Sequence, residues 1–404
     1  MIGWSTPGRL GLFGGKNNPL HVYKIIAILA ACLFFAPKVI RTSRRFISPS
    51  PELTVQPKAG DGPAITEAAY EAWKEKWEAE EVNKVALVKM AKLPGVIDLD
   101  GDLTIKNKPA RTLNLRDVLL GNQGVNALVE LMRWEKEPCP YCSRRLRSLN
   151  LGSNEIGDSG AQAISSVLKR NRKILRLYLD VNRISDPGAV AIGEMLSMNV
   201  KLERLYLWSN RIRAKGAVAI AQGLASNSKS KLESLYLDSN DMGDGGAKAI
   251  ADMLAKRHRM TELGLRDVGM TTEGAIAVFR GVGESSRVET LDVSKNNIGP
   301  DAGAAIRDML LASTKMKRLD LSENRLGDQG TKVIAAALKK NSSLQALWLH
   351  DNDIGDEGIH ALLSALKVNV GLRTLWVRAN PRISEEVLDK LKLLTYLKAI
   401  MLIL

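Results

Sequence analysis

Hydrophobic residues recur with a fixed spacing along the last three-quarters of this chain, in a motif that ends in asparagine. The motif reads L-x-x-L-x-L-x-x-N-x-I, and its first full copy runs from Leu146 to Ile156. Its last framework position returns every 28 residues, with one step of 30, at Leu151, Leu179, Leu207, Leu237, Leu265, Val293, Leu321, Leu349 and Val377. A weaker copy lies upstream on Leu113 and Leu115. The pattern therefore predicts about ten repeated structural units.

Each unit predicts a short strand followed by a helix. Leucines that alternate with other residues indicate a strand whose leucines point inward. An alanine-rich stretch with helical periodicity follows, as in residues 160–168, and predicts an amphipathic helix. The glycines that open these helices are Gly160, Gly188, Gly216, Gly246, Gly330 and Gly358. The amide of a motif asparagine can satisfy backbone groups in a buried turn, and these residues are Asn154, Asn182, Asn210, Asn240, Asn296, Asn324, Asn352 and Asn380.

From Leu113 to Ile383 the unit L-x-x-L-x-L-x-x-N-x-I-G-x-x-G-A-x-A-I-x-x-x-L resembles the ribonuclease-inhibitor-like subfamily of leucine-rich repeats. The resemblance implies an α/β solenoid, a horseshoe with a concave parallel sheet and convex helices. It also implies a protein-binding role, since most members bind proteins and some activate a small GTPase. Val118 and Val268 replace the asparagine, and Ala302 replaces the helix-opening glycine, so we expect locally irregular turns there.

Composition divides the chain into four segments. Residues 1–51 form an N-terminal anchor or targeting segment, and residues 52–98 form a linker and an N-terminal capping helix. Residues 99–383 form the repeat domain, and residues 384–404 are expected to form a C-terminal capping helix. The ends of a solenoid need such covers. The last six residues are apolar and would promote association if they were exposed, so we expect them to cover the last repeat.

The first segment contains a charge-free apolar run at residues 25–36, flanked by Lys24 and Lys38. Taken from 20 to 40 it is long enough for a marginal transmembrane helix, if both lysines reach the headgroups. Pro37 disfavours cleavage after the run, and the basic cluster that follows favours a cytoplasmic repeat domain. We therefore predict a membrane anchor. The alternative is a cleaved presequence that directs the chain to a plastid or a mitochondrion.

The positive net charge of the chain raises the question of whether it binds nucleic acid. The chain carries +14, of which residues 1–51 supply 7 because they contain seven basic and no acidic residues. Elsewhere, the basic clusters at 169–173, 256–259 and 339–340 fall at expected helix ends, where cations complement the helix dipole. Nucleic-acid binding would need basic residues gathered on one surface, so no nucleic-acid partner is predicted.

Motifs for chemistry are weak in this chain. The sequence Cys139-Pro140-Tyr141-Cys142 matches the active-site motif of glutaredoxins. No thioredoxin-like unit surrounds it, so redox activity is a distant alternative. One such pair is half a zinc site, and we predict no metal and no cofactor. A GTPase-activating role of the leucine-rich-repeat type is the nearer alternative, although no arginine matches the catalytic position that it needs. The sequence favours a binding scaffold over an enzyme.

The outward-facing strand residues are the candidate site for a protein partner. Between the last two framework positions they include Tyr178, Tyr206, Tyr236, Asp292, Asp320, Trp348 and Trp376, and two positions later they include Asp180, Trp208, Asp238, His350 and Arg378. Strands lie about 4.8 Å apart, so the pattern predicts two aromatic patches. Tyrosine, tryptophan and arginine dominate interface energetics. Alternatively, stacked aromatic rings stabilise neighbouring strands and have no binding role.

Overall fold

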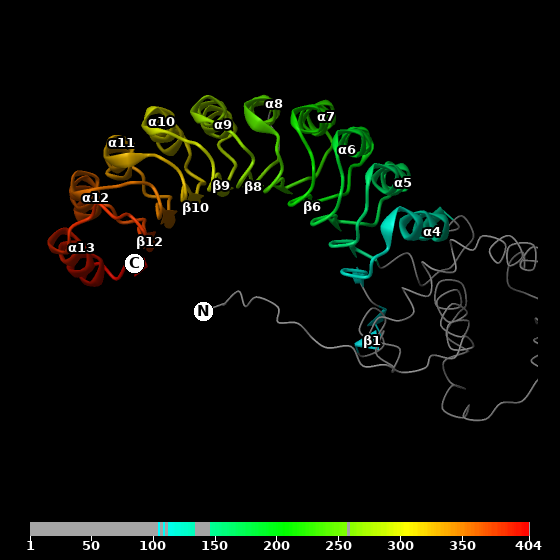
Figure 1. Cartoon of the computed structure of the whole chain (residues 1–404), viewed down its shortest axis with the longest axis horizontal. Coiled ribbons are helices and arrows are strands. Elements are labelled where there is room, and N and C mark those ends of the chain that lie inside the picture. The colour runs from blue at the N-terminus through cyan, green and yellow to red at the C-terminus, as the bar shows by residue number, and fades with distance from the viewer. Residues whose placement is uncertain (1–103, 106–107, 110–111, 134–145, 257–258, 404) are drawn as a thin grey trace, which may run out of the picture.

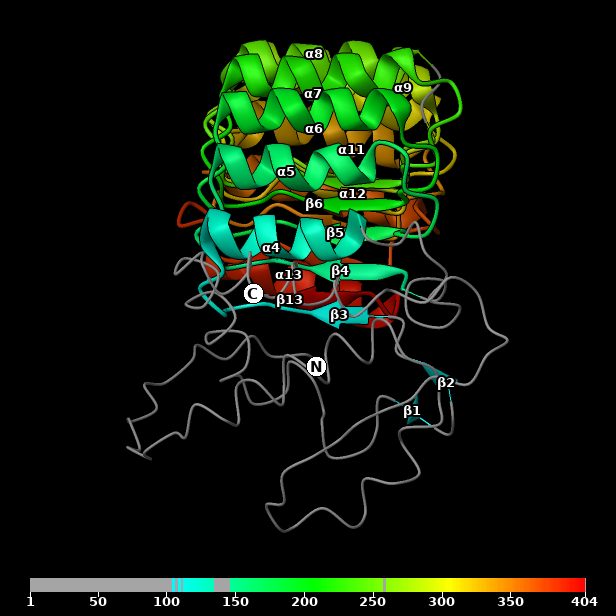
Figure 2. The same ribbon diagram turned by 90° about the vertical axis from the view of Figure 1, so that its right-hand side faces the viewer.

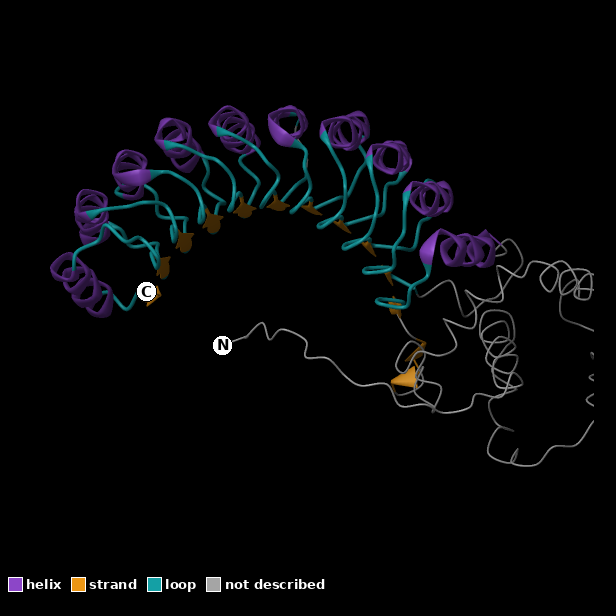
Figure 3. Cartoon of the chain, viewed as in Figure 1, coloured by secondary structure: helices purple, strands orange, loops and turns teal. Residues whose placement is uncertain are grey.

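The computed structural model describes residues 104–105, 108–109, 112–133, 146–256 and 259–403. Over these residues an eleven-stranded parallel sheet lines the inner side of a curved solenoid, and ten helices form its outer layer (Figure 1). Figure 3 separates the two layers by type of element. The predicted repeat solenoid is confirmed, with one strand more than the expected ten.

Each strand of the large sheet pairs in parallel with its neighbour in sequence, so the spatial order follows the chain from β3 to β13. The strands are β3 Thr112–Asn114, β4 Ser148–Asn150, β5 Arg176–Tyr178, β6 Arg204–Tyr206, β7 Ser234–Tyr236, β8 Glu262–Gly264, β9 Thr290–Asp292, β10 Arg318–Asp320, β11 Ala346–Trp348, β12 Thr374–Trp376 and β13 Met401–Ile403. A separate antiparallel pair consists of β1 Thr104–Ile105 and β2 Lys108–Pro109.

One helix follows each strand from β3 to β12. The helices are α4 Gly121–Arg133, α5 Asp158–Leu168, α6 Asp186–Met198, α7 Ala214–Ser226, α8 Gly243–Ala255, α9 Thr272–Ser285, α10 Gly303–Ala312, α11 Gly327–Leu338, α12 Asp356–Val368 and α13 Glu385–Leu397. Figure 2 shows α4 to α8 stacked in chain order. The motif leucines and the inward helix residues fill the space between the layers. Leu177, Leu179 and Ile192, for example, have no exposed surface. Burial of these apolar side chains drives the stacking of the repeats.

The motif asparagines form a ladder that ties each turn to the previous repeat. The Asn182 side-chain nitrogen donates to the carbonyl oxygens of Leu151 and Leu179 at 3.0 Å each. Its oxygen accepts from the backbone nitrogens of Asn154 at 3.0 Å and Ile156 at 2.9 Å. The amide therefore satisfies buried backbone groups of two successive repeats, as the sequence predicts.

The residue just before each ladder asparagine has a positive φ, in the left-handed region that favours glycine. None of these residues is a glycine, and Val181, at φ 52°, is even β-branched. The Val181 nitrogen donates to the Trp208 carbonyl oxygen at 2.9 Å. Hydrogen bonds from repeat to repeat thus hold a conformation that the side chains disfavour.

A second set of contacts explains the helix-opening glycines. Asp158, at the start of α5, accepts hydrogen bonds from the backbone nitrogens of Ser185 and Gly188 at the start of α6. A Cβ atom on Gly188 would lie 2.7 Å from the Asp158 carboxylate. Each aspartate of this kind caps the next helix, and only glycine leaves room for that approach.

The three departures from the motif change the local backbone. At Ala302 the chain forms a 3-10 turn, Pro300–Ala302, before α10 begins. Residues 116–117 and 266–267, next to Val118 and Val268, form hydrogen-bonded turns where the repeats with asparagine have bends. The asparagine of the next repeat still contacts them, since Val118 N donates to Asn154 Oδ1 at 3.0 Å and Val268 N to Asn296 Oδ1 at 3.1 Å. The expected irregularities are therefore present and leave the solenoid intact.

The C-terminal end differs from a purely helical cap. Helix α13 lies within the stretch expected to cap the solenoid, but the apolar tail then adds strand β13 to the sheet, with Leu402 opposite Leu375. The predicted segments 1–51 and 52–98, and the Cys139–Cys142 pair, lie outside the described residues. None of the helices in the described ranges is long and apolar enough to cross a membrane.

Candidate binding surface on the concave face

Three columns of side chains point outward from the inner face of the sheet. The central column contains Tyr178, Tyr206, Tyr236, Gly264, Asp292, Asp320, Trp348 and Trp376, and the following column contains Asp180, Trp208, Asp238, Arg266, Ser294, Ser322, His350 and Arg378. The preceding column contains Arg176, Arg204, Ser234, Glu262, Thr290, Arg318, Ala346 and Thr374. The columns predicted from the sequence do not include the preceding one, although the strand alternation extended one step back indicates it.

The tyrosines of the central column stack face to face. The ring centroids of Tyr178 and Tyr206 are 4.3 Å apart, and those of Tyr206 and Tyr236 are 4.9 Å apart, with the planes within a few degrees of parallel. The Tyr236 hydroxyl donates to the Glu262 carboxylate at 2.8 Å, and burial together with this bond raises the pKa of Tyr236. The ring faces thus contact one another, which supports the alternative in which the stack stabilises the sheet.

Asp180 is buried instead of being presented on the surface, since only 1% of it is exposed. Arg116 reaches across from the first repeat and donates to the Asp180 carboxylate at 2.5 Å and to the Ser153 hydroxyl at 3.0 Å. The same guanidinium lies 5.9 Å from the ring centroid of Trp208, within cation–π range. The N-terminal patch, which consists of the three stacked tyrosines and Trp208, therefore has Arg116 and Trp208 partly exposed at its surface and the Asp180 carboxylate buried.

Three aspartates occupy the middle of the face. Asp238 accepts a hydrogen bond from the Arg266 backbone nitrogen at 2.9 Å, and burial together with nearby Asp292 raises its pKa to about 6. The same two causes raise the pKa of Asp320. Asp292 and Asp320 each accept a 2.6 Å bond from the serine hydroxyl two residues later. Within the described part of the chain none of the three carboxylates forms an ion pair, although the nearby Arg266 guanidinium interacts electrostatically with them.

The C-terminal patch contains both remaining tryptophans of the face. Trp348 lies beside Asp320 and Trp376 in the strand register. The His350 ring is 4.9 Å from that of Trp376, whereas Trp348 has no ring contact among the described residues. All three side chains are half-buried, and Arg378 is exposed. Strands β8 to β10 separate this patch from the N-terminal one, so the structure keeps the two predicted patches apart.

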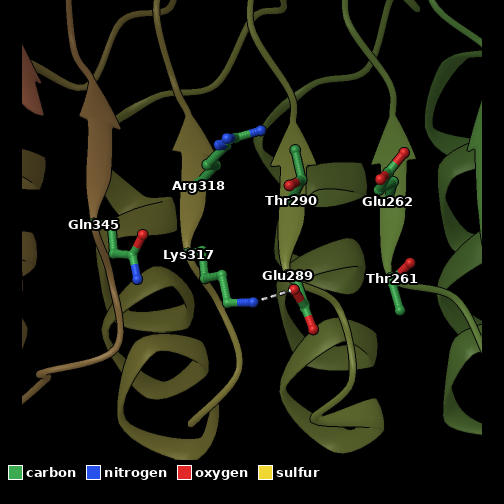
Figure 4. Close-up of a pocket in the computed structure, with 7 residues that line it drawn as sticks. All are labelled: Thr261, Glu262, Glu289, Thr290, Lys317, Arg318 and Gln345. Atoms are coloured by element: carbon green, nitrogen blue, oxygen red, sulfur yellow. Dashed lines mark hydrogen bonds and ion pairs between the residues drawn. The ribbon is translucent and has the colours of Figure 1, made fainter.

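A shallow pocket of about 270 Å³ lies at the beginnings of strands β8 to β11. Figure 4 shows its polar lining of Thr261, Glu262, Glu289, Thr290, Lys317, Arg318 and Gln345. Lys317 forms an ion pair with Glu289 at 2.5 Å. In the described ranges no group of three acidic, histidine or cysteine residues could hold a metal ion. The polar groups of the pocket extend the concave surface along the preceding column.

Comparison with known proteins identifies the repeats. A family model described as "Leucine Rich repeat" matches residues 142–165, 170–193, 228–251, 285–306, 312–335 and 340–363. The chain therefore contains leucine-rich repeats. A search of curated proteins finds no match.

Solved structures with some similarity include leiomodin-1 actin-binding site 2, with 21% identity over 39% of this chain and 86% of that chain, at a TM-score of 0.32. The yeast Rad7 and Elc1 complex has 14% identity over 68% of this chain and 71% of that one, at a TM-score of 0.45. An internalin of Listeria monocytogenes has 16% identity over 72% and 86%, at a TM-score of 0.36.

Proposed function

We propose that this protein is an interaction scaffold that binds a protein partner on the concave face of its repeats. The observation that carries the proposal is the pair of half-buried tryptophans, Trp208 and Trp348, on outward columns of the sheet. Unlike the tyrosines, Trp348 has no ring stacked on it in the described structure. A large aromatic side chain on a concave surface with charged neighbours is the usual composition of a binding hot spot.

The charge pattern indicates which partner surface fits. Asp292 and Asp320 lie between the two aromatic patches, and Asp238 lies beside the N-terminal one. None of the three forms an ion pair within the described residues. Their field would attract basic side chains and orient an approaching protein. We therefore expect a partner with a basic centre flanked by apolar side chains, and an association rate that falls as salt rises.

Footprinting tests this surface directly. The full-length chain is used to capture partners, and the complex and the free protein are then oxidised briefly by hydroxyl radicals. Oxidation of Trp208 and Trp348 should fall in the complex, whereas Met198, exposed on helix α6, serves as the control and should be unchanged. Equal oxidation of both tryptophans in the free and bound protein would place the binding surface elsewhere.

We also propose that the repeats belong to the ribonuclease-inhibitor-like subfamily, and a GTPase-activating role is the alternative function. The 28-residue unit resembles the ribonuclease-inhibitor-like subfamily, and that likeness supports a concave protein-binding site. A GTPase-activating role would need an arginine that stabilises the transition state. Stimulated GTP hydrolysis that is lost on substitution of one arginine would favour that role over simple binding.

A membrane tether at residues 20–40 remains part of the proposal, because the apolar run and its flanking lysines support it. Carbonate extraction of membranes should then leave the full-length protein in the pellet. Release into the supernatant, or a mature N-terminus after residue 36, would instead support a cleaved targeting segment.

A further inference from the structure

Exposed apolar side chains gather at the C-terminal end of the solenoid. Of the eleven large hydrophobic residues that are exposed in the described structure, six lie between residues 368 and 401. Four of them form what we call the C-terminal apolar patch: Leu393, Tyr396, Leu397 and Met401, which are 61, 83, 70 and 63% exposed. The first three share one face of α13 at helical spacing. Monomeric soluble proteins rarely expose so many large apolar side chains in one place.

The same end presents an open sheet edge. Strand β13 pairs with β12 on one side only, among the described residues. The Met401 nitrogen donates to the Arg373 carbonyl oxygen, and the Ile403 carbonyl oxygen accepts from the Val377 nitrogen. Because backbone groups alternate along a strand, the N–H and C=O of Leu402 point away from β12. Within the described residues neither group has a hydrogen-bond partner, so both can bond another strand.

From these two features we propose that the chain forms a two-fold symmetric dimer through α13 and β13. A two-fold axis at Leu402, perpendicular to the sheet, pairs β13 with its copy in antiparallel orientation. Met401 then faces Ile403 of the second copy. The axis also places both helix layers on the same side, so the last turns of the two α13 helices lie beside each other and bury Leu393 against Leu397.

The charge of α13 does not oppose the approach of a second copy. The whole chain carries +14, which opposes self-association. Residues 385–398, however, contain three acidic and three basic residues. Lys390 pairs with Glu386 and Lys392 with Asp389 within the helix. Two copies of α13 therefore meet without net repulsion, and their antiparallel dipoles attract.

Sedimentation equilibrium of the full-length chain, from about 1 to 100 µM, tests the dimer. The parent should convert from monomer to dimer as concentration rises. Leu393→Glu/Leu397→Glu and, separately, Tyr396→Glu should raise the dimer dissociation constant about tenfold or more, since each places carboxylates in the interface. Leu311→Glu and Val190→Glu, exposed on α10 and α6, are matched controls that should dimerise like the parent.

Cross-linking tests the orientation. In a background with Cys32, Cys139 and Cys142 changed to serine, Met401→Cys chains are mixed with Ile403→Cys chains. Disulfide-linked dimers should form between the two kinds of chain. They should be absent when Leu311→Cys chains replace the Ile403→Cys chains in the mixture. A parent that stays monomeric, or glutamate variants that are folded by circular dichroism and still dimerise fully, would overturn the proposal.

Discussion

The buried turns and the concave columns of this protein use the same repeat in opposite ways. The turns place asparagine at the same position in most repeats, with the same hydrogen bonds in each, as at Asn182 and Asn324. The central concave column changes from tyrosine to glycine, aspartate and tryptophan within a few strands. A turn residue meets the equivalent turn of the neighbouring repeat, whereas many concave side chains, such as Trp208 and Trp348, are partly exposed to solvent. Positions that hold the fold therefore repeat, and positions free to bind a partner vary.

The largest loss of stability should come from removing the asparagine side chain that holds a buried turn. Asn182→Ala removes the acceptor for the backbone nitrogens of Asn154 and Ile156 and leaves them buried and unpaired. We expect the free energy of unfolding in urea to fall by about 3 kcal/mol, since each unsatisfied buried group costs about 1–3 kcal/mol. Asn297→Ala, at an exposed residue of an isolated β-bridge, is the control and should change stability little, since the bridge uses backbone groups. Equal losses in the two variants would mean that the ladder does not hold the turns.

The helix layer offers a second test of repeated close packing. A Cβ atom on Gly223 of α7 would lie 2.0 Å from the Gly193 carbonyl oxygen of α6. Gly223→Ala should therefore cost about 2 kcal/mol, the usual scale of overpacking. At Gly245 of α8 the nearest atom to a new Cβ is 3.4 Å away, so Gly245→Ala should leave stability unchanged or slightly higher. A Gly223 variant as stable as the Gly245 variant would contradict the packing of α6 against α7.

On the concave face we expect a substitution to raise the stability of the fold instead of lowering it, because a residue kept for binding can destabilise the fold. The folded pKa of Asp238 is about 6, above its ordinary 3.8, so the folded state binds the proton more tightly. The contribution of Asp238 to stability is therefore greatest at low pH and declines as pH rises from about 4 to 6. Asp238→Asn keeps the acceptor for Arg266 and should stabilise the fold at pH 8 by about 1.5 kcal/mol, a figure discounted for solvent screening.

Thermal unfolding of parent and variant between about pH 4 and 8 checks the Asp238 prediction. The stability difference should shrink towards zero at the acidic end, where the parent carboxyl is protonated. An Asp238 variant that is less stable than the parent at pH 8 would show that the carboxylate stabilises the face.

The repeated positions could be predicted from the sequence much better than the variable ones. The leucine core, the asparagine ladder and the helix-opening glycines were all visible as a period of 28 residues. A second ladder at the helix ends has the same period but was missed. In it Asn199 donates to the Leu168 carbonyl oxygen at 2.6 Å and Asn369 to that of Leu338 at 2.7 Å.

The rest could not be predicted from a repeat pattern. Arg116 covers Asp180 from 64 residues away because its long side chain reaches past the repeat of β4, and no local spacing signals that contact. The conversion of the tail into β13 depends on the open edge of β12, which exists only once the solenoid is stacked. The outward orientation of the concave columns was predictable, but which of their side chains remain accessible depended on such neighbours.

The most direct test of the central claim is the affinity of a captured partner for the concave face, measured by titration calorimetry. Trp208→Ala and Trp348→Ala should each weaken binding by about 2 kcal/mol with the fold unchanged. The convex-face variants Val190→Ala and Met198→Ala, at exposed positions of α6, should bind like the parent. A Trp208→Ala/Trp348→Ala double variant that binds as tightly as the parent would contradict a partner site on the concave face.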